Sequence, residues 1–181
     1  MNKRSLAARI GLGAALGLAL AGGTSAVAAY ADSGDTAAPA AAASDKSVVT
    51  TKTLSSGAAA KVAEAAQKEA AKQHQRVTVV IVDRAGNVIA EIKGDGAGPQ
   101  SPESAERKAF TAVSFGKATS ELAKNVDLSK PSTADIPGTL FLAGGVPVTA
   151  DKAPIAGVGV AGAPGGDIDE SIADAGLKAL K

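Results

Sequence analysis

The stretch Val77–Phe110, VTVVIVDRAGNVIAEIKGDGAGPQSPESAERKAF, decides the fold of this 181-residue chain. The segment Arg76–Val82 is almost entirely Val and Ile, which predicts a strand buried on both faces. The residues that follow, Asp83–Asn87, predict a tight turn, with Gly86 at a position that favours positive φ. Apolar and polar residues then alternate over Val88–Lys93, which predicts a partner strand. The stretch therefore opens with an antiparallel hairpin.

A glycine-rich loop, Gly94–Pro99, follows the hairpin and superficially resembles a dinucleotide-binding loop. Pro99 occupies the position of the last required glycine, and the preceding strands form a hairpin instead of a βαβ unit. We therefore do not expect a dinucleotide site. Pro102 predicts the first turn of a helix that continues to Val113, because proline is tolerated at the first helical position.

The flanking sequence predicts an α+β domain with an antiparallel sheet of about five strands and helices on both faces. Besides the elements above, helices are expected at Leu54–Gln73, at Thr119–Asn125 and from Asp167 to about Leu180. The last helix is expected to open with a capping box made by Asp167 and Glu170. The three further strands are expected at Thr139–Leu142, Val146–Val148 and Ile155–Ala161.

The N-terminus reads as a targeting segment. A positively charged start is followed by the short apolar run Ile10–Ala21 and then by small residues. This pattern predicts a cleaved signal peptide over residues 1–31, since the run is shorter than the ~20 apolar residues that a membrane span needs. Residues 32–47 are rich in Ala, Ser and Thr and predict a disordered linker. The predicted domain is 48–181, and we expect it to be secreted or associated with the cell envelope.

Composition limits the classes of function. The predicted mature chain keeps 16 of the 19 Lys and Arg residues and all 18 Asp and Glu residues, a net charge near −2. This balance argues against a nucleic-acid-binding protein, which needs a clustered basic face. With no Cys and a single histidine, His74, the chain has little material for serine-histidine catalysis, thiol catalysis or a multi-histidine metal site.

Two later segments combine with the opening stretch: AGGVPV at Ala143–Val148 and GVGVAGAPGGDIDE at Gly157–Glu170. Together they resemble the extracellular haem-binding proteins of the haem-degrading, glycolate-utilisation-protein-like family, from about Val48 to the C-terminus. The resemblance implies a profilin-like sheet, binding of haem and iron ions, and assembly into a homo-oligomer. It also implies that the protein scavenges or degrades haem and reports redox or iron stress to the extracytoplasmic part of a membrane sensor histidine kinase.

Few residues can ligate a haem iron. The usual ligands are His, Cys, Met and Tyr, and His74 is the one certain to remain in the predicted mature chain. It lies at a predicted helix end, where a His more often faces solvent. Elimination therefore favours an oxygen ligand or haem contact without a strong axial bond. For an oxygen ligand we select Thr139, which follows Gly138; the alternative is that Thr139 only begins a strand. Arg107 and Lys108 are candidates for binding the haem propionates, or else are solvated surface cations.

Glu103 and Glu106 are three residues apart, which places both carboxylates on one face of a helix. Carboxylate oxygens are hard ligands that suit iron ions, calcium or magnesium. The alternative is structural: acids in the first turn offset the helix dipole, and Glu103 can pair with Arg107. In the family that the chain resembles, extracellular haem-binding members carry this acidic pair as a surface iron site. We therefore predict an iron site that needs further ligands.

Two other functions stay open at this point. The chain could be an enzyme, or an enzyme-associated module, of glycolate or corrinoid metabolism, because relatives in the resembled family belong to those pathways. The predicted export signal argues against such a cytoplasmic role. A structural module without a ligand is the third possibility.

Overall fold

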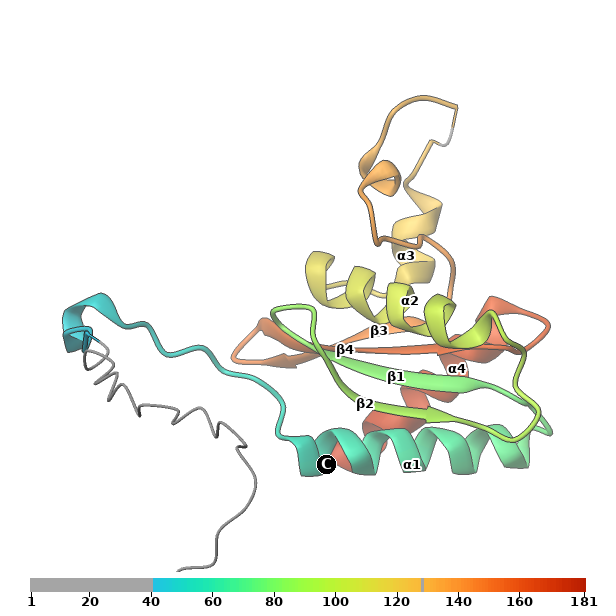
Figure 1. Cartoon of the computed structure of the whole chain (residues 1–181). Helices are drawn as coiled ribbons and strands as arrows, with labels where there is room; N and C mark the ends of the chain where they lie inside the picture. Colours follow the sequence, from blue (N-terminus) through green and yellow to red (C-terminus); the bar gives the residue numbers. More distant parts are fainter. Residues whose placement is uncertain (1–40, 128) are drawn as a thin grey trace, which may run out of the picture. The chain divides into compact units, whose positions relative to one another are not determined.

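Four antiparallel strands form one sheet in the order β2-β1-β4-β3 (Figure 1). Strands β1 (Thr78–Asp83) and β2 (Val88–Lys93) form the predicted hairpin, and β3 (Gly145–Ala150) and β4 (Ala153–Ala161) form a second one. Strand β1 also pairs with β4, so these two strands occupy the centre of the sheet. The run of Val and Ile in β1 is buried, as its composition predicts.

Helices cover both faces of the sheet (Figure 1). Helices α1 (Ser56–Lys72) and α4 (Gly166–Leu177) lie together on one face. Helix α2 (Ser101–Phe115) lies across the other face, and the short helix α3 (Thr119–Lys124) follows it. Within the described part of the chain, single-turn 3-10 helices lie at Asp45–Ser47, Thr133–Asp135 and Lys178–Leu180.

Alternate residues of β1 divide the core between the two faces. Val79 and Ile81 belong to the larger apolar cluster, which includes residues of α1 and α4. Val80 and Val82 belong to a smaller cluster with α2. This alternation follows from the period of two in a strand, and it explains why Val79–Val82 are all apolar.

Helix α2 approaches β4 more closely than side chains normally allow. A Cβ atom placed at Gly159 would lie 1.9 Å from the carbonyl oxygen of Ala105, and one at Gly157 would lie 2.1 Å from that of Ala109. Both positions therefore need glycine, and the small residues on the inner face of α2 complete the contact. This close packing fixes the distance between α2 and the sheet.

The predicted strand Thr139–Leu142 is not a strand, and over the residues that the structure describes the sheet has four strands instead of about five. Arg107 donates a hydrogen bond from Nη2 to the carbonyl oxygen of Thr139 at 2.8 Å. The backbone N–H of Leu140 donates to Oγ1 of Thr111, also at 2.8 Å. Because helix α2 takes up these backbone groups, the segment cannot pair with the sheet.

The predicted capping box at the start of α4 was also wrong. The helix begins at Gly166 with Gly165 as its N-cap, and no side chain caps it. Glu170 instead accepts a hydrogen bond from the backbone N–H of Gly144 at 3.1 Å. The acidic spacing that suggested a local cap therefore serves a contact with a distant segment.

The structure is a computed structural model, which describes residues 41–127 and 129–181. The predicted signal peptide, 1–31, and residues 32–40 of the predicted linker lie outside the described residues. Residues Asp45–Lys181 form one compact unit. Among the described residues, no helix has both the length and the apolar character needed to cross a bilayer.

Candidate functional site

The outer face of helix α2 carries the two predicted iron ligands, Glu103 and Glu106, and both are exposed. Oε1 of Glu103 lies 3.8 Å from Nη1 of Arg107, and the Glu103 side chain is 80% exposed. Such a loose, solvated pair contributes little to stability. Within the described residues, Glu106 makes no hydrogen bond or ion pair. Both carboxylates are therefore open to a ligand.

The acidic pair stands without a third protein ligand. Among the described residues, no three His, Asp or Glu side chains lie close enough together to hold a metal ion. Two carboxylates on one copy of the chain thus leave most of a metal's coordination positions to water or to other molecules, because iron ions take more than two ligands.

Arg107 links the acidic pair to the segment that precedes β3. Its Nη2 holds the Thr139 carbonyl oxygen, while its own carbonyl oxygen accepts a hydrogen bond from Oγ1 of Thr111 at 2.7 Å. The side chain is still 42% exposed. Its Nε is buried and lacks a partner among the described residues. The guanidinium is therefore fixed in place, and its Nη1, which is only loosely paired with Glu103, is the donor that can bind an anion.

Thr139 lies beside Arg107, but its hydroxyl is not presented to solvent. The residue is 3% exposed, and Oγ1 donates a hydrogen bond to the carbonyl oxygen of Ile136 at 2.8 Å. In this conformation the hydroxyl closes a local turn. The structure therefore brings Glu103, Arg107 and Thr139 together, with Thr139 beneath the surface.

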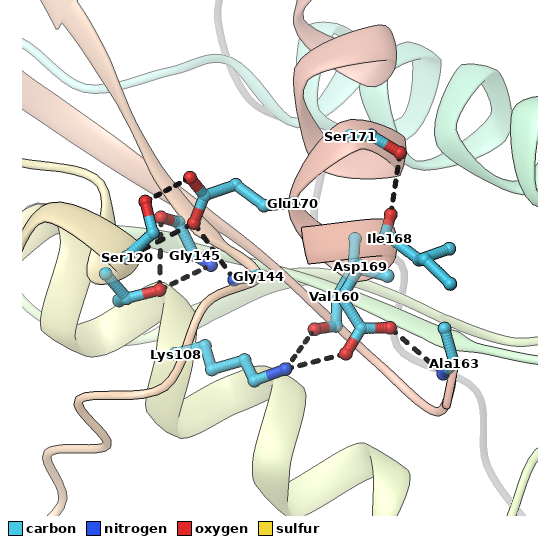
Figure 2. A network of polar contacts seen from close by, with 11 residues as sticks. Lys108, Ser120, Gly144, Gly145, Val160, Ala163, Ile168, Asp169, Glu170 and Ser171 are labelled. Carbon is cyan, nitrogen blue, oxygen red and sulfur yellow. Dashed lines mark hydrogen bonds and ion pairs between the residues drawn. The ribbon is translucent and has the colours of Figure 1, made fainter. Parts of the chain in front are cut away.

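Lys108 points toward Val160 and Asp169 in the interior of the protein (Figure 2). Its Nζ donates to Oδ2 of Asp169 at 2.8 Å and to the carbonyl oxygen of Val160 at 2.9 Å. The Lys108 and Asp169 side chains are 2% and 4% exposed. This burial corrects the prediction for Lys108: it is not a surface cation, and its amine is not open to a haem propionate.

The surroundings of Asp169 shift the pKa of its carboxyl group. Burial raises the pKa of Asp169 above its ordinary value, while the hydrogen bond and the charge of Lys108 oppose that rise. Because its pKa is raised, the carboxyl group of Asp169 contributes most to stability at pH values below its own pKa in the unfolded chain. This contribution is lost as the pH rises through its pKa in the folded protein. The positive charge of Lys108 reduces the cost of burying the ionised carboxylate of Asp169. The pair is therefore a structural element of the core.

A second polar network lies next to this pair (Figure 2). Glu170 accepts hydrogen bonds from the hydroxyl of Ser120 and from the backbone N–H of Gly144. Oγ1 of Thr119 accepts from the backbone N–H of Gly145 at 2.8 Å. These bonds fix the start of α3 to α4 and to the entrance of β3.

His74 is exposed just beyond the end of α1, as its sequence position predicted. It adopts a φ of 54°, which a residue other than glycine rarely does. Helix α1 covers the face of the sheet opposite α2. His74 therefore does not belong to the group of residues around Arg107.

A family model described as haem degrading protein HbpS-like matches residues 54–178. The chain belongs to this HbpS-like family. The solved structure of HbpS is 55% identical to this HbpS-like chain, with a TM-score of 0.75, and the match covers 78% of this chain and 99% of that one. Family membership confirms the resemblance inferred from the sequence.

Two further solved structures bear on the site. One is a double variant of HbpS from Streptomyces reticuli, in which two glutamates three positions apart are replaced by aspartate; it is 54% identical, with a TM-score of 0.75, over 80% of this chain and 98% of that one. The other is PduOC, solved as a complex with haem; it is 27% identical, with a TM-score of 0.65, over 71% and 95%. No curated protein sequence matches this HbpS-like chain.

Proposed function

We propose that this HbpS-like protein is an exported haem- and iron-binding protein that scavenges or degrades haem. The observation that carries the proposal is the open polar group formed by Glu103, Glu106 and Arg107 on the outer face of α2. None of these side chains is needed for the core, which lies on the inner face. The haem complex of PduOC supports haem as a ligand.

The acidic pair is proposed to bind iron ions. Glu103 and Glu106 have the same three-residue spacing as the two glutamates changed in the HbpS double variant. Because the contact between Glu103 and Arg107 is loose, at 3.8 Å, an iron ion can take the carboxylate without breaking a strong ion pair. Water or a second copy of the chain supplies the remaining ligands.

The described residues fit the propionate groups of haem better than they fit its iron. Arg107 is positioned to hold a propionate through charge-assisted hydrogen bonds. Lys108 takes no part, because its charge is already paired. Thr139 can reach a haem iron only if its hydroxyl turns away from Ile136. Bound haem supplies a redox-active iron, and the protein holds and orients it.

A haemin titration of the mature chain, followed by visible absorbance, tests this proposal. Arg107→Gln is expected to weaken haemin binding at least about tenfold, because a hydrogen bond to a charged group contributes about 1.5–3 kcal/mol. The matched control is Lys61→Gln, which removes an exposed cation from α1 on the other face. Equal haemin affinity in all three proteins would overturn the role of Arg107, and no uptake by the native chain would overturn haem binding.

The proposal extends from haem and iron binding to signalling. The protein is proposed to report redox or iron stress to the extracytoplasmic part of a sensor histidine kinase. If iron is the signal, binding to that kinase part should change when iron is added. The double variant Glu103→Gln with Glu106→Gln should bind it equally with and without iron. An iron-dependent change that survives in this variant would separate signalling from the acidic pair.

Several copies of the chain are proposed to assemble. Small apolar residues are abundant, with 45% of the chain hydrophobic but 2% aromatic, and such faces permit close contact between subunits. Light scattering of the mature protein at micromolar concentration should give a multiple of the monomer mass. A monomer mass across that range would overturn this part.

A further inference from the structure

The segment just before α1 exposes more apolar surface than the domain surface around it. Val49 is 88% exposed and Val48 is 58% exposed, the highest values among the large apolar side chains in the described residues. Both belong to Val48–Thr53, here called the arm, which has no regular secondary structure. Five of its six residues are Val or Thr. Such β-branched residues favour strands, so the arm has the composition of a strand without a partner.

The arm is held loosely against its own domain. A cavity of about 270 Å³ is lined by residues 50–52, by the turn between β3 and β4 and by Arg84, so the arm is not closely packed there. Lys52 forms an ion pair with Asp151, but the two side chains are 70% and 74% exposed. A solvated pair of this kind contributes little. The arm can therefore leave this position at low cost.

One edge of the sheet is open to a further strand. Strand β3, at one edge, contains Pro147, which has no N–H to donate and blocks pairing. Strand β2, at the other edge, has no proline and exposes 43% of Val88. Gln67 donates to the carbonyl oxygens of Val77 and Ile92 and so binds the end of the β1–β2 ladder, not the free edge. The pairing of β2 with β1 shifts so that Ile89 is an extra residue, and the segment that can accept a strand, Val88–Glu91, contains this bulge.

The arm and β2 match in length and in charge. Each has six residues. If the two run parallel with Val49 beside Val88, and the arm follows β2 residue by residue through the bulge at Ile89, then Lys52 lies beside Glu91. This register joins two exposed valines and two opposite charges. Cross-strand pairs of both kinds stabilise a sheet.

The match to HbpS indicates that the arm has a counterpart there. It covers 78% of the 181 residues, which is about 141, whereas only 128 residues follow Thr53. The matched region must therefore begin before Leu54. A counterpart of at least part of the arm is thus present in the solved HbpS chain.

We propose that the arm of one copy adds as a strand to the free edge of β2 in a second copy. Strand addition satisfies backbone groups that the arm and the edge otherwise leave to solvent, and the side chains set the register. The inference rests on the proposed homo-oligomer and specifies one contact that holds it together.

Cysteine cross-linking tests this contact cleanly, because the chain has no cysteine of its own. The mature chains Val49→Cys and Val88→Cys, of which one carries a mass tag, are refolded together and mildly oxidised. A disulfide needs Cα atoms within roughly 7 Å, which neighbouring strands provide. The expected product is a cross-linked pair with one chain of each kind. Ala90→Cys serves as a second acceptor, for a register shifted by two residues. The matched control acceptor is Thr149→Cys, which is exposed on the proline-blocked edge.

The outcomes separate the contact from the assembly. No mixed product with Val88→Cys or Ala90→Cys, or equal product with Thr149→Cys, overturns the strand addition even if light scattering still gives an oligomer. A monomer mass overturns both. An internal disulfide in a dilute double variant, Val49→Cys with Val88→Cys, would show that the arm pairs with its own sheet and would also overturn the proposal. As a second readout, Val48→Asp with Val49→Asp should speed hydrogen exchange over Val88–Glu91 about tenfold, equivalent to about 1.4 kcal/mol.

Discussion

Arg107 and Lys108 are neighbours in the sequence and carry the same charge, yet they have opposite surroundings. Arg107 is 42% exposed and makes a loose contact with Glu103. Lys108 is 2% exposed and is bound to Asp169 at 2.8 Å. The difference arises because consecutive residues of a helix point about 100° apart, so one faces solvent and the next faces the sheet.

The two faces of helix α2 therefore have different functions. The inner face, with Lys108 and the alanines that contact Gly157 and Gly159, positions the helix. The outer face, with Glu103, Glu106 and Arg107, is free to bind ligands. Changes on the inner face should therefore alter stability, and changes on the outer face should alter binding.

The largest effect is expected from breaking the buried ion pair. Lys108→Met leaves the Asp169 carboxylate buried without its cation, which should lower the free energy of unfolding by about 3–5 kcal/mol. Adding Asp169→Leu removes the uncompensated charge and should restore part of this loss. Lys68→Met, at an exposed position of α1, is the control and should change stability by less than about 0.5 kcal/mol. Urea denaturation measures all four proteins, and an equal loss in the control would contradict the division.

The same variant gives a pH test. In Lys108→Met, the pKa of Asp169 should rise further above its already raised value, because the opposing charge is gone. The buried carboxyl then becomes neutral as the pH falls through that pKa. The stability deficit relative to the native chain should therefore shrink at acidic pH and be largest at neutral pH. Unfolding free energies measured across this range test the sign; a deficit that grows in acid would contradict it.

A smaller loss is expected where α2 contacts β4. Gly159→Ala places a Cβ 1.9 Å from the Ala105 carbonyl oxygen, so the helix must move away from the sheet. Such overpacking typically costs about 1–3 kcal/mol. Gly57→Ala is the matched control, because nothing lies within 4 Å of its added Cβ. The control lies in the first turn of α1, so its stability in thermal denaturation should change by less than about 0.5 kcal/mol. A loss in Gly57→Ala as large as in Gly159→Ala would contradict the close-packing account.

Local sequence patterns predicted most of the fold. The Val/Ile run and its glycine turn gave β1 and β2, and helical spacing gave α1 and α2. Thr139–Leu142 failed because its β-like composition is overridden by hydrogen bonds to Arg107 and Thr111, which are distant in sequence. The predicted capping box with Glu170 was wrong for the same reason, since the hydrogen-bond partners of Glu170 lie in other segments.

The candidate site was predictable to different degrees. Helical spacing was enough to place Glu103 and Glu106 together on the exposed face. The burial of Lys108 also had a signal: it lies three residues after Ala105 and four before Ala112, on the apolar stripe. Its partner had none, because Asp169 is 61 residues away and only the tertiary fold joins the two.

The central claim is that the outer face of α2 binds iron while the inner face maintains the fold. The most direct test measures iron binding and thermal unfolding on the mature double variant Glu103→Gln with Glu106→Gln. The matched control, Glu64→Gln with Glu91→Gln, also removes two exposed carboxylates but away from α2. We predict that the α2 variant loses at least about tenfold in iron affinity, while its stability falls by no more than the helix-dipole contribution, about 0.3–1 kcal/mol per charge. The control should bind iron like the native chain. Unchanged iron binding in the α2 variant, with stability lost, would contradict the claim and leave the two glutamates as a structural feature of the helix start.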